Sequence, residues 1–261
     1  MGYLKSAAEI LALQQAMREP QYLQGSTLTN RFLTDATSIA DILPPGLEPD
    51  KAPVATLTIS AFEGGVVGPF RSAALYVSAR HKEVCGNYIL AMYVTGDGPV
   101  IFGRSIYGEP KFHGDVVFER NGGAMRAKVS HAGQHIMEVE AEIDDAPVAT
   151  PPSPIIVFTY LAQFSPVTAD LIGDAHLVVM HQHVDYRIHR EGKGKIKLHG
   201  NDLDPLNELP VRSIISTSYT EADSIVKPQI VQSIAGADFL PYAIGRMPDW
   251  NVLQRNKANY A

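Results

Sequence analysis

A single lysine follows a proline near the middle of the chain, in the stretch GRSIYGEPKFHGD at residues 103–115. Lys111 has apolar and aromatic neighbours, among them Ile106, Tyr107 and Phe112. Removing a lysine from water disfavours its charged form, and the uncharged amine is the form that attacks a carbonyl carbon. The stretch therefore predicts a nucleophilic lysine that forms an imine with a ketone, or else an ordinary solvated loop lysine.

The neighbouring residues are suited to the same chemistry. Pro110 restricts the backbone before the lysine, and Gly108 permits a tight approach. Glu109 could carry protons during imine formation, or it could point outward into solvent. Tyr107 and Tyr88 could line the pocket or donate a hydrogen bond, or they could simply pack. We therefore predict the lysine and this glutamate as the catalytic residues.

Two blocks of sequence resemble one known family. Residues 98–112, GPVIFGRSIYGEPKF, carry a Gly-Arg pair followed by Pro-Lys, and residues 192–226 contain PLNELPV and a Ser-x-Ser pair. Both are similar to the acetoacetate decarboxylase family, in which the lysine of that Pro-Lys forms a Schiff base with the substrate ketone. NYILAMY at 87–93 and LPPGLEPD at 43–50 match more weakly. The matches run in family order from about residue 28 to residue 227.

The resemblance implies a carbon–carbon lyase in which the imine of Lys111 accepts the electrons released when a neighbouring bond breaks. It also implies a small oxo acid or ketone as the partner, a homo-oligomer and no cofactor. Decarboxylation of a β-keto acid is the first expectation. The alternative is aldol condensation, dehydration or cyclisation of an oxo acid, which some members of the superfamily perform.

The chain departs from the family pattern at the polar residues around the lysine. Phe112 stands where the family has a second lysine, and Gly25 stands near the position of the arginine that grips the substrate carboxylate. Thr58 and Ser72 fall near the two pocket glutamates. Other cations would have to replace that anchor, with surface arginines as the alternative interpretation. The candidate substrate-binding residues are Arg104, Arg71, Arg31, Tyr107, Phe112 and Tyr88.

Two rival functions come from other classes. His181 and His183 lie at i and i+2, which is one face of a strand and suits two imidazole ligands of a metal-dependent barrel enzyme. His176, Asp185 or His189 would have to complete such a site, and satisfied strand histidines are the simpler interpretation. A barrel that only binds a small apolar ligand is the third possibility.

Composition excludes several classes of partner. The net charge of −6 and the pI near 5.8 give no broad positive field for nucleic acid. No apolar run approaches the length that spans a bilayer, so we expect a cytoplasmic protein. The one cysteine, Cys85, cannot form an internal disulfide, and we expect it to be buried as a small hydrophobe.

The periodicity predicts a mainly β or α+β fold, an antiparallel sheet or closed β-barrel with an N-terminal helix and a few short helices. Ser6 and Glu9 fit a capping box, and Asp35 fits the N-cap of a second helix. We expect one domain, with the N-terminal helix within residues 1–25 and a C-terminal arm at 240–261.

The remaining segments alternate as strands do or carry turn signals. An Asn-Gly turn indicates that a meander of antiparallel strands occupies residues 115–143. A Pro-rich loop follows it at residues 144–154, and one or two short helices are expected within residues 220–236. The other expected strands are 54–62, 74–80, 87–95, 99–103, 175–190, 192–200 and 209–220.

Overall fold

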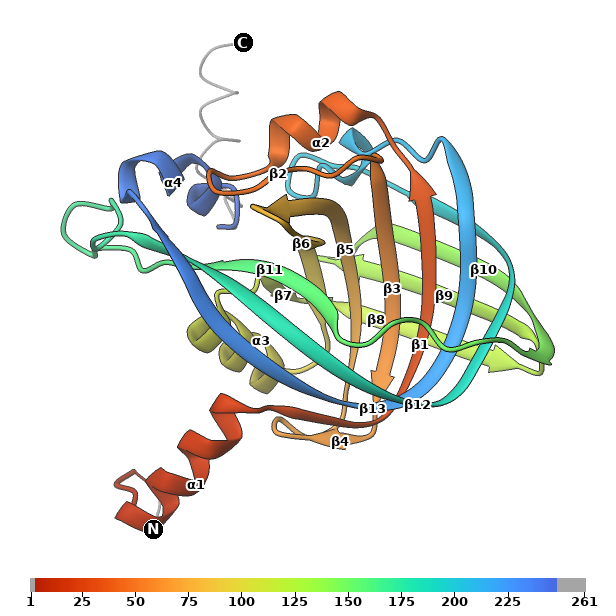
Figure 1. The fold of residues 1–261 in the computed structure, drawn as a ribbon, viewed down its shortest axis with the longest axis horizontal. Coiled ribbons are helices and arrows are strands. Elements are labelled where there is room, and N and C mark those ends of the chain that lie inside the picture. The colour runs from red at the N-terminus through yellow and green to blue at the C-terminus, as the bar shows by residue number, and fades with distance from the viewer. Residues whose placement is uncertain (1–2, 248–261) are drawn as a thin grey trace.

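The computed structural model describes residues 3–247, and most of them lie in strands (Figure 1). Among these residues, no helix combines the length and apolar character needed to cross a membrane. The helices are α1 (Ala7–Arg18), α2 (Ala36–Ile42), α3 (Asp97–Phe102) and α4 (Gly236–Ile244), with a π-helical turn at Gly103–Tyr107 and a 3-10 turn at Leu206–Glu208. The strands are β1 (Gln21–Leu33), β2 (Glu48–Pro49), β3 (Val54–Phe62), β4 (Gly64–Gly65), β5 (Phe70–His81), β6 (Val84–Val94), β7 (Lys111–His113), β8 (Asp115–Asn121), β9 (Ala124–His131), β10 (Gln134–Pro147), β11 (Ile155–Leu161), β12 (Ala175–Leu198) and β13 (Ser213–Ile234).

Seven strands pair into a continuous ring in the order β11-β6-β5-β3-β1-β13-β12, and β12 pairs with β11 again. Most of these pairings are antiparallel, whereas β6 pairs in parallel with both β11 and β7. The expected mainly β fold with barrel character is confirmed. The inner face of each of these strands therefore lines the space that the ring encloses.

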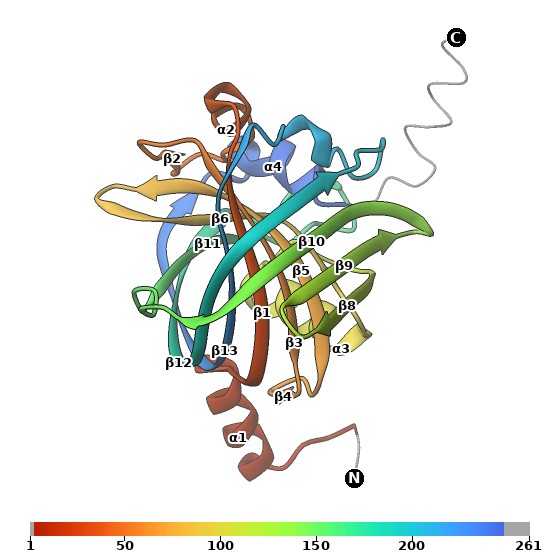
Figure 2. The same cartoon turned by 90° about the vertical axis from the view of Figure 1, so that its right-hand side faces the viewer.

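The long strand β12 pairs with the barrel along its first part and with the meander along its last part. Residues 176–182 pair with β11 in the ring, whereas residues 192–198 pair with β10. Through this second pairing β12 carries the meander β10-β9-β8, which Figure 2 shows as a layer beside the barrel strands. The predicted meander is therefore confirmed, and it forms a second sheet.

Alternation along each strand divides its side chains between two environments. On β1, Leu28 and Phe32 are fully buried in the main core, which also contains Val129 from β9. Thr27 and Thr29 point to the other face, into the space that the ring encloses. The main core therefore fills the gap between the barrel wall and the second sheet, and the barrel interior is lined by a different set of residues.

Two helices begin where the sequence indicates. The Ser6 side chain accepts from the N–H of Glu9, and the Glu9 carboxylate accepts from the N–H of Ser6, which completes the capping box of α1. The helix ends at Arg18, and β1 already begins at Gln21, so the helix is shorter than the range 1–25. The N-cap of α2 is Asp35, as predicted, but its carboxylate pairs with Arg212 instead of the helix N-terminus.

Two secondary-structure predictions are wrong. Residues 99–103 form helix and not a strand, because Gly96 turns the chain with φ of 81° and Pro99 is tolerated in the first turn of α3. Residues 220–234 continue β13 instead of forming helices, since they pair with the first half of β12 along its length. The expected C-terminal arm lies largely outside the described residues, and the single domain stays a prediction.

A buried hydrogen-bond network ties the second sheet to the barrel. The Asp204 carboxylate accepts from the Tyr93 hydroxyl at 2.6 Å and lies 2.9 Å from Nδ1 of His131. Burial by itself raises the pKa of Asp204, but the hydrogen bonds from His131 and Tyr93 outweigh it and hold the pKa below its ordinary value. Asp204 thus joins β6 and β9 through its charged form.

Replacing this carboxylate should make the protein less stable and less sensitive to acid. A lowered folded-state pKa adds stability above the ordinary pKa of about 3.9, and that stability is lost as the pH falls through the folded-state value. We expect Asp204→Asn to cost about 1–3 kcal/mol at pH 7 and to flatten the acid limb of a plot of Tm against pH. The exposed control Asp170→Asn should follow the wild type; an Asp204→Asn curve identical to both would contradict the role.

Candidate functional site

The turn just before β7 directs two charged side chains toward each other. The N–H of Lys111 donates to the carbonyl of Glu109 at 2.8 Å, an i to i+2 bond that closes a tight turn around Pro110. Proline suits this position because its φ is already close to that of such a turn. The side chains on either side of the proline consequently meet.

Lys111 and Glu109 form a buried ion pair. Nζ of Lys111 lies 2.7 Å from Oε2 of Glu109, and only 4% and 9% of their side chains are exposed. Oε2 has no hydrogen-bond donor other than this amine among the described residues. Each group compensates the charge of the other at a site where an unpaired charge would be costly to bury.

The Gly-Arg pair of the sequence motif supports this arrangement directly. A Cβ on Gly103 would lie 2.3 Å from Oε2 of Glu109 and 2.8 Å from Nζ of Lys111, so only glycine leaves room for the ion pair. Nη1 of Arg104 donates to the Lys111 carbonyl at 2.9 Å, and its guanidinium lies 5.3 Å from the Phe112 ring centre. The π-helical turn that carries both residues therefore positions the lysine backbone.

Lys111 and Glu109 line a cavity of about 700 Å³ inside the ring of strands. Tyr22, Phe62 and Phe70 pack against one another along its wall, with ring centres 5.0 to 6.1 Å apart, and Nζ of Lys111 lies 5.9 Å from the Phe70 ring centre. The amine therefore faces a partly open and partly aromatic space inside the barrel.

Three buried phenols surround the carboxylate. Burial, and then the negative charge of Glu109, raise the pKa of Tyr107 and of Tyr76, and the same causes raise the pKa of Tyr22. All three hydroxyls therefore stay protonated at neutral pH; the Tyr107 hydroxyl donates to the Met17 carbonyl, whereas Tyr22 and Tyr76 line the cavity. Tyr22 and Tyr76 were not predicted: alternation along β5 places Tyr76 on the face that carries Ser72, but Tyr22 reaches the face of Thr27 only because β1 is irregular between Tyr22 and Gly25.

Four of the eight predicted site residues line this cavity, namely Lys111, Glu109, Tyr107 and Arg31. Arg31 is exposed at the cavity's rim and does not contact the amine. The other four lie elsewhere among the described residues. These residues are Arg104, Arg71, Phe112 and Tyr88.

Three of them pack behind the reactive loop. Phe112 stacks on Tyr93, on the opposite side of β7 from the amine, because successive strand residues point to opposite faces. The Tyr88 hydroxyl accepts a hydrogen bond from Arg246, whose Nη1 donates to the Gly108 carbonyl. These residues, like Arg104, hold the loop in place and do not face the cavity.

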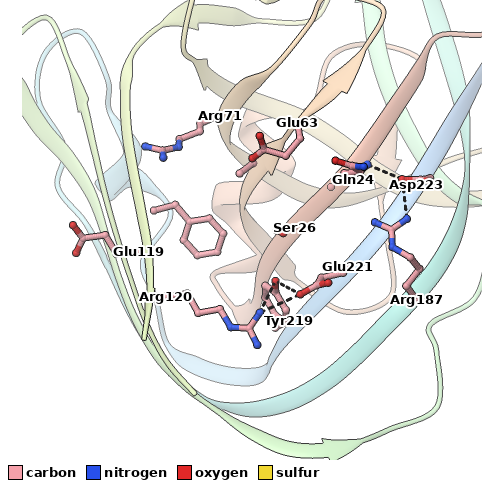
Figure 3. Close-up of a pocket in the computed structure, with 13 residues that line it drawn as sticks. Gln24, Ser26, Glu63, Arg71, Glu119, Arg120, Arg187, Tyr219, Glu221 and Asp223 are labelled. Atoms are coloured by element: carbon pink, nitrogen blue, oxygen red, sulfur yellow. Dashed lines mark hydrogen bonds and ion pairs between the residues drawn. The ribbon is translucent and has the colours of Figure 1, made fainter. Parts of the chain in front are cut away.

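Arg71 lies in a separate charged pocket of about 730 Å³ (Figure 3). Its guanidinium is 3.5 Å from the Val116 carbonyl, and the same pocket contains the ion pairs of Arg120 with Glu221 and of Arg187 with Asp223. Residues 70 and 72 of β5 face the barrel cavity, so the intervening arginine points out of it. Arg71 is therefore not placed to anchor a substrate at Lys111.

Three of the four positions that differ from the family pattern line the Lys111 cavity, and Phe112 is the exception. Gly25, Thr58 and Ser72 all belong to its wall, so a neutral group stands where the resemblance places an arginine and two glutamates. Cys85 is exposed at the rim, with Sγ 3.6 Å from Asp50, which corrects the expectation that it is buried. It lies next to the exposed turn that joins β5 to β6.

The metal interpretation finds no support in the described part of the chain. No group of three or more His, Cys, Asp or Glu side chains within residues 3–247 could hold a metal ion. His181 and His183 alternate with cavity-lining Met180, Gln182 and Val184, so they point away from the barrel interior.

Comparison with known proteins identifies the family of the chain. The family model of acetoacetate decarboxylase matches residues 11–233. The chain belongs to the acetoacetate decarboxylase family. Decarboxylase DEC1 of Cochliobolus heterostrophus is 24% identical over 214 residues, which cover 77% of this chain and 82% of that protein. The resemblance seen in the two sequence blocks is thereby confirmed.

Solved structures of the acetoacetate decarboxylase family share the fold. Acetoacetate decarboxylase from Legionella pneumophila superposes with a TM-score of 0.77 at 17% identity, covering 82% of this chain and 87% of that one. The enduracididine biosynthesis enzyme MppR, complexed with pyruvate, gives 0.72 at 16% identity, covering 82% and 90%. The chain is thus a divergent member of the acetoacetate decarboxylase family with that family's architecture.

Filling the space beside Gly103 should disable the lysine without unfolding the protein. In Gly103→Ala the new methyl group must push the Lys111 and Glu109 side chains apart, whereas alanine is better than glycine within a helix by about 0.5–1 kcal/mol. We expect the rate of reductive labelling of Lys111 by a ketone and borohydride, followed by peptide mass spectrometry, to fall at least tenfold with little change in Tm.

The matched control is Gly98→Ala in the neighbouring helix α3, where the nearest atom to the new Cβ is 3.8 Å away. This variant should label Lys111 at the wild-type rate. Equal labelling rates in both glycine variants would show that the lysine does not depend on the space at Gly103.

Proposed function

We propose that this protein is a Schiff-base enzyme of the acetoacetate decarboxylase family, with Lys111 as the nucleophile and a β-oxo acid as the substrate that it decarboxylates. The single observation that supports this most is the buried amine 2.7 Å from a buried carboxylate, inside a cavity that admits a carbonyl compound. Membership of the family and the name of the relative DEC1 favour the same reaction class.

The pair supplies the proton transfers that imine formation needs. Glu109 takes a proton from the ammonium of Lys111, and the free amine adds to the ketone carbon. The carboxylic acid then returns this proton to the hydroxyl of the carbinolamine, which leaves as water and gives the iminium ion. One carboxylate thus serves first as base and then as acid.

Loss of carbon dioxide follows from the charge of the iminium ion. The bond to the carboxylate breaks, its electron pair moves toward the nitrogen of Lys111, and a neutral enamine remains. Glu109, which is a carboxylate once water has left, takes up a proton from solvent and delivers it to the enamine carbon, which restores the iminium ion. Water then adds, releases the ketone and regenerates the amine.

A second reaction of the same imine is the alternative. No cation stands beside the amine among the described residues, and the cavity has Thr58 and Ser72 at the positions that the resemblance assigns to glutamates. An enamine formed from an oxo acid can attack an aldehyde, which gives aldol condensation and, after loss of water, dehydration. MppR, with a similar fold, has been solved with the condensation product of pyruvate and imidazole 4-carboxaldehyde.

Removing the amine should abolish both the adduct and the release of carbon dioxide. Deleting one partner of a buried ion pair costs about 3–5 kcal/mol, so we choose the double variant Lys111→Met with Glu109→Gln, which leaves no unpaired charge. Wild-type protein treated with a 3-oxo acid and borohydride should carry the reduced adduct on the peptide that contains Lys111, and the double variant should carry none.

Exposed Lys128, replaced by Met, provides the control and should keep both the adduct and turnover. An adduct or carbon dioxide release that persists in the folded double variant would disprove the role of Lys111. Condensation of pyruvate with an aldehyde by the wild type, without carbon dioxide release from any 3-oxo acid, would favour the alternative reaction.

The carboxylate has a separate test. Glu109→Gln keeps the size of the side chain and removes the proton acceptor, so turnover should fall by roughly 10²- to 10⁴-fold, the usual contribution of a positioned acid or base. Lys111 should still be the labelled residue at long incubation times. The exposed control Glu83→Gln should behave as the wild type, and a Glu109→Gln variant with undiminished turnover would assign the proton transfers to another group.

A further inference from the structure

Half of the barrel wall presents hydroxyl groups to the cavity. The contributing strands β5, β3, β1 and β13 are neighbours in the ring, and their cavity-facing residues stand directly opposite one another. One row of paired residues is Thr220, Thr27, Ser60 and Ser72, and the next is Ser218, Thr29 and Thr58. The wall is therefore an ordered array of hydroxyls.

Part of this array is available to a ligand. Thr27 and Ser60 hydrogen-bond to each other at 2.9 Å. Within residues 3–247, the side chains of Thr29, Ser218 and Thr220 have no hydrogen-bond partner in the protein, although all three line the cavity. Each hydroxyl offers one donor and two acceptor positions, so a bound molecule with its own oxygen atoms would find several partners here.

The opposite half of the wall is apolar in part, and it also carries the polar side chains of Asn87, Gln182 and His189. Ile89 and Met92 of β6, Val157 of β11 and Met180 of β12 line it, and all four are buried. These strands complete the ring on the side away from the hydroxyl rows. Around Met92 and Met180 the cavity consequently offers hydrocarbon contacts opposite the hydroxyl rows, along the same space that contains the amine.

Size and charge argue against a short oxo acid as the natural occupant. A volume of about 700 Å³ would hold more than ~20 water molecules at about 30 Å³ each, and it lies within the range of about 300–1,000 Å³ typical of sites for larger ligands. Arg31 is the one arginine among the described lining residues, and it is exposed at the rim. A short oxo acid would leave most of this space to water.

We infer that the substrate is a long-chain ketone or β-oxo acid that bears several further hydroxyl or oxo groups. This inference rests on the proposed function, because it places the reacting carbonyl at Lys111. The oxygen groups of the chain then hydrogen-bond to the wall that contains Thr29 and Ser218, and its methylene groups pack on Met92 and Met180. Selectivity for the substrate comes from this two-faced wall, not from an arginine that grips a carboxylate.

Three ketone probes distinguish the effect of the substrate's chain length from the effect of its hydroxyl groups. They are butanone, a long unsubstituted methyl ketone, and the same long ketone with hydroxyls on alternate carbons. Each is titrated against the protein with borohydride, and the labelling of Lys111 is followed by mass spectrometry. The hydroxylated ketone should reach half-maximal labelling at a concentration at least tenfold below that of either other probe. Equal concentrations for the two long ketones, or for all three probes, would overturn the inference.

Variants of the hydroxyl wall give an independent check. The double variant Thr29→Val with Ser218→Ala removes two paired hydroxyls at nearly constant volume, and it should reduce the preference for the hydroxylated over the unsubstituted ketone about tenfold, since each lost hydrogen bond is worth about 0.5–1.5 kcal/mol. Ser213→Ala removes an exposed hydroxyl from the same strand β13 and should leave the preference unchanged. If the double variant keeps the wild-type preference for the hydroxylated ketone, the hydroxyl wall does not select the substrate.

A fourth probe distinguishes failure of the inference from failure of the proposed function. The long hydroxylated chain with its ketone reduced to an alcohol cannot form an imine, so its binding by calorimetry reports on the cavity alone. If this alcohol binds to the wild type and weakly to the double wall variant while no ketone labels Lys111, the inferred ligand class holds and the lysine chemistry fails. If the alcohol does not bind, the inferred ligand class is wrong.

Discussion

The structure of the site depends on one buried contact, the 2.7 Å approach of the Lys111 amine to the Glu109 carboxylate. An isolated charge at either position would be costly to bury, and together the two groups compensate each other. The surrounding features serve this contact. The turn at Pro110 directs both side chains, the missing Cβ of Gly103 makes room for them, and Arg104 holds the lysine carbonyl. The Gly-Arg and Pro-Lys of the sequence motif are thus parts of a single support.

The ring of strands surrounds this ion pair and limits its exposure to solvent. Alternation makes each strand serve two environments, with residues such as Leu28 in the main core and residues such as Thr29 in the cavity. The second sheet is essential to this division because it covers the outer face of the barrel wall. The Asp204 network, with Tyr93 and His131, joins the two parts behind β7. One face of each strand therefore contributes to the stable core, and the other face lines the reactive cavity.

Most features that depend on residues close together in the sequence were predicted from local patterns. The capping box at Ser6, the meander after residue 115 and the reactive Pro-Lys all follow from short-range patterns, and the family resemblance supplied the barrel. The error at residues 99–103 has a local cause in Gly96 and Pro99, whereas contacts between distant segments account for others. Residues 220–234 look helical in isolation but pair with β12, and Arg71 of β5 points out of the barrel. The hydroxyl wall needs strand register, which the sequence does not show.

The most direct measurement of the central claim is a crystal structure of the protein reduced with borohydride in the presence of a methyl ketone. Lys111 should show continuous electron density from Nζ into a carbon chain inside the barrel, with the Glu109 carboxylate within hydrogen-bond distance of the new secondary amine. An unmodified Lys111 in a crystal whose protein carries the adduct on a surface lysine would contradict the assignment of this amine as the nucleophile.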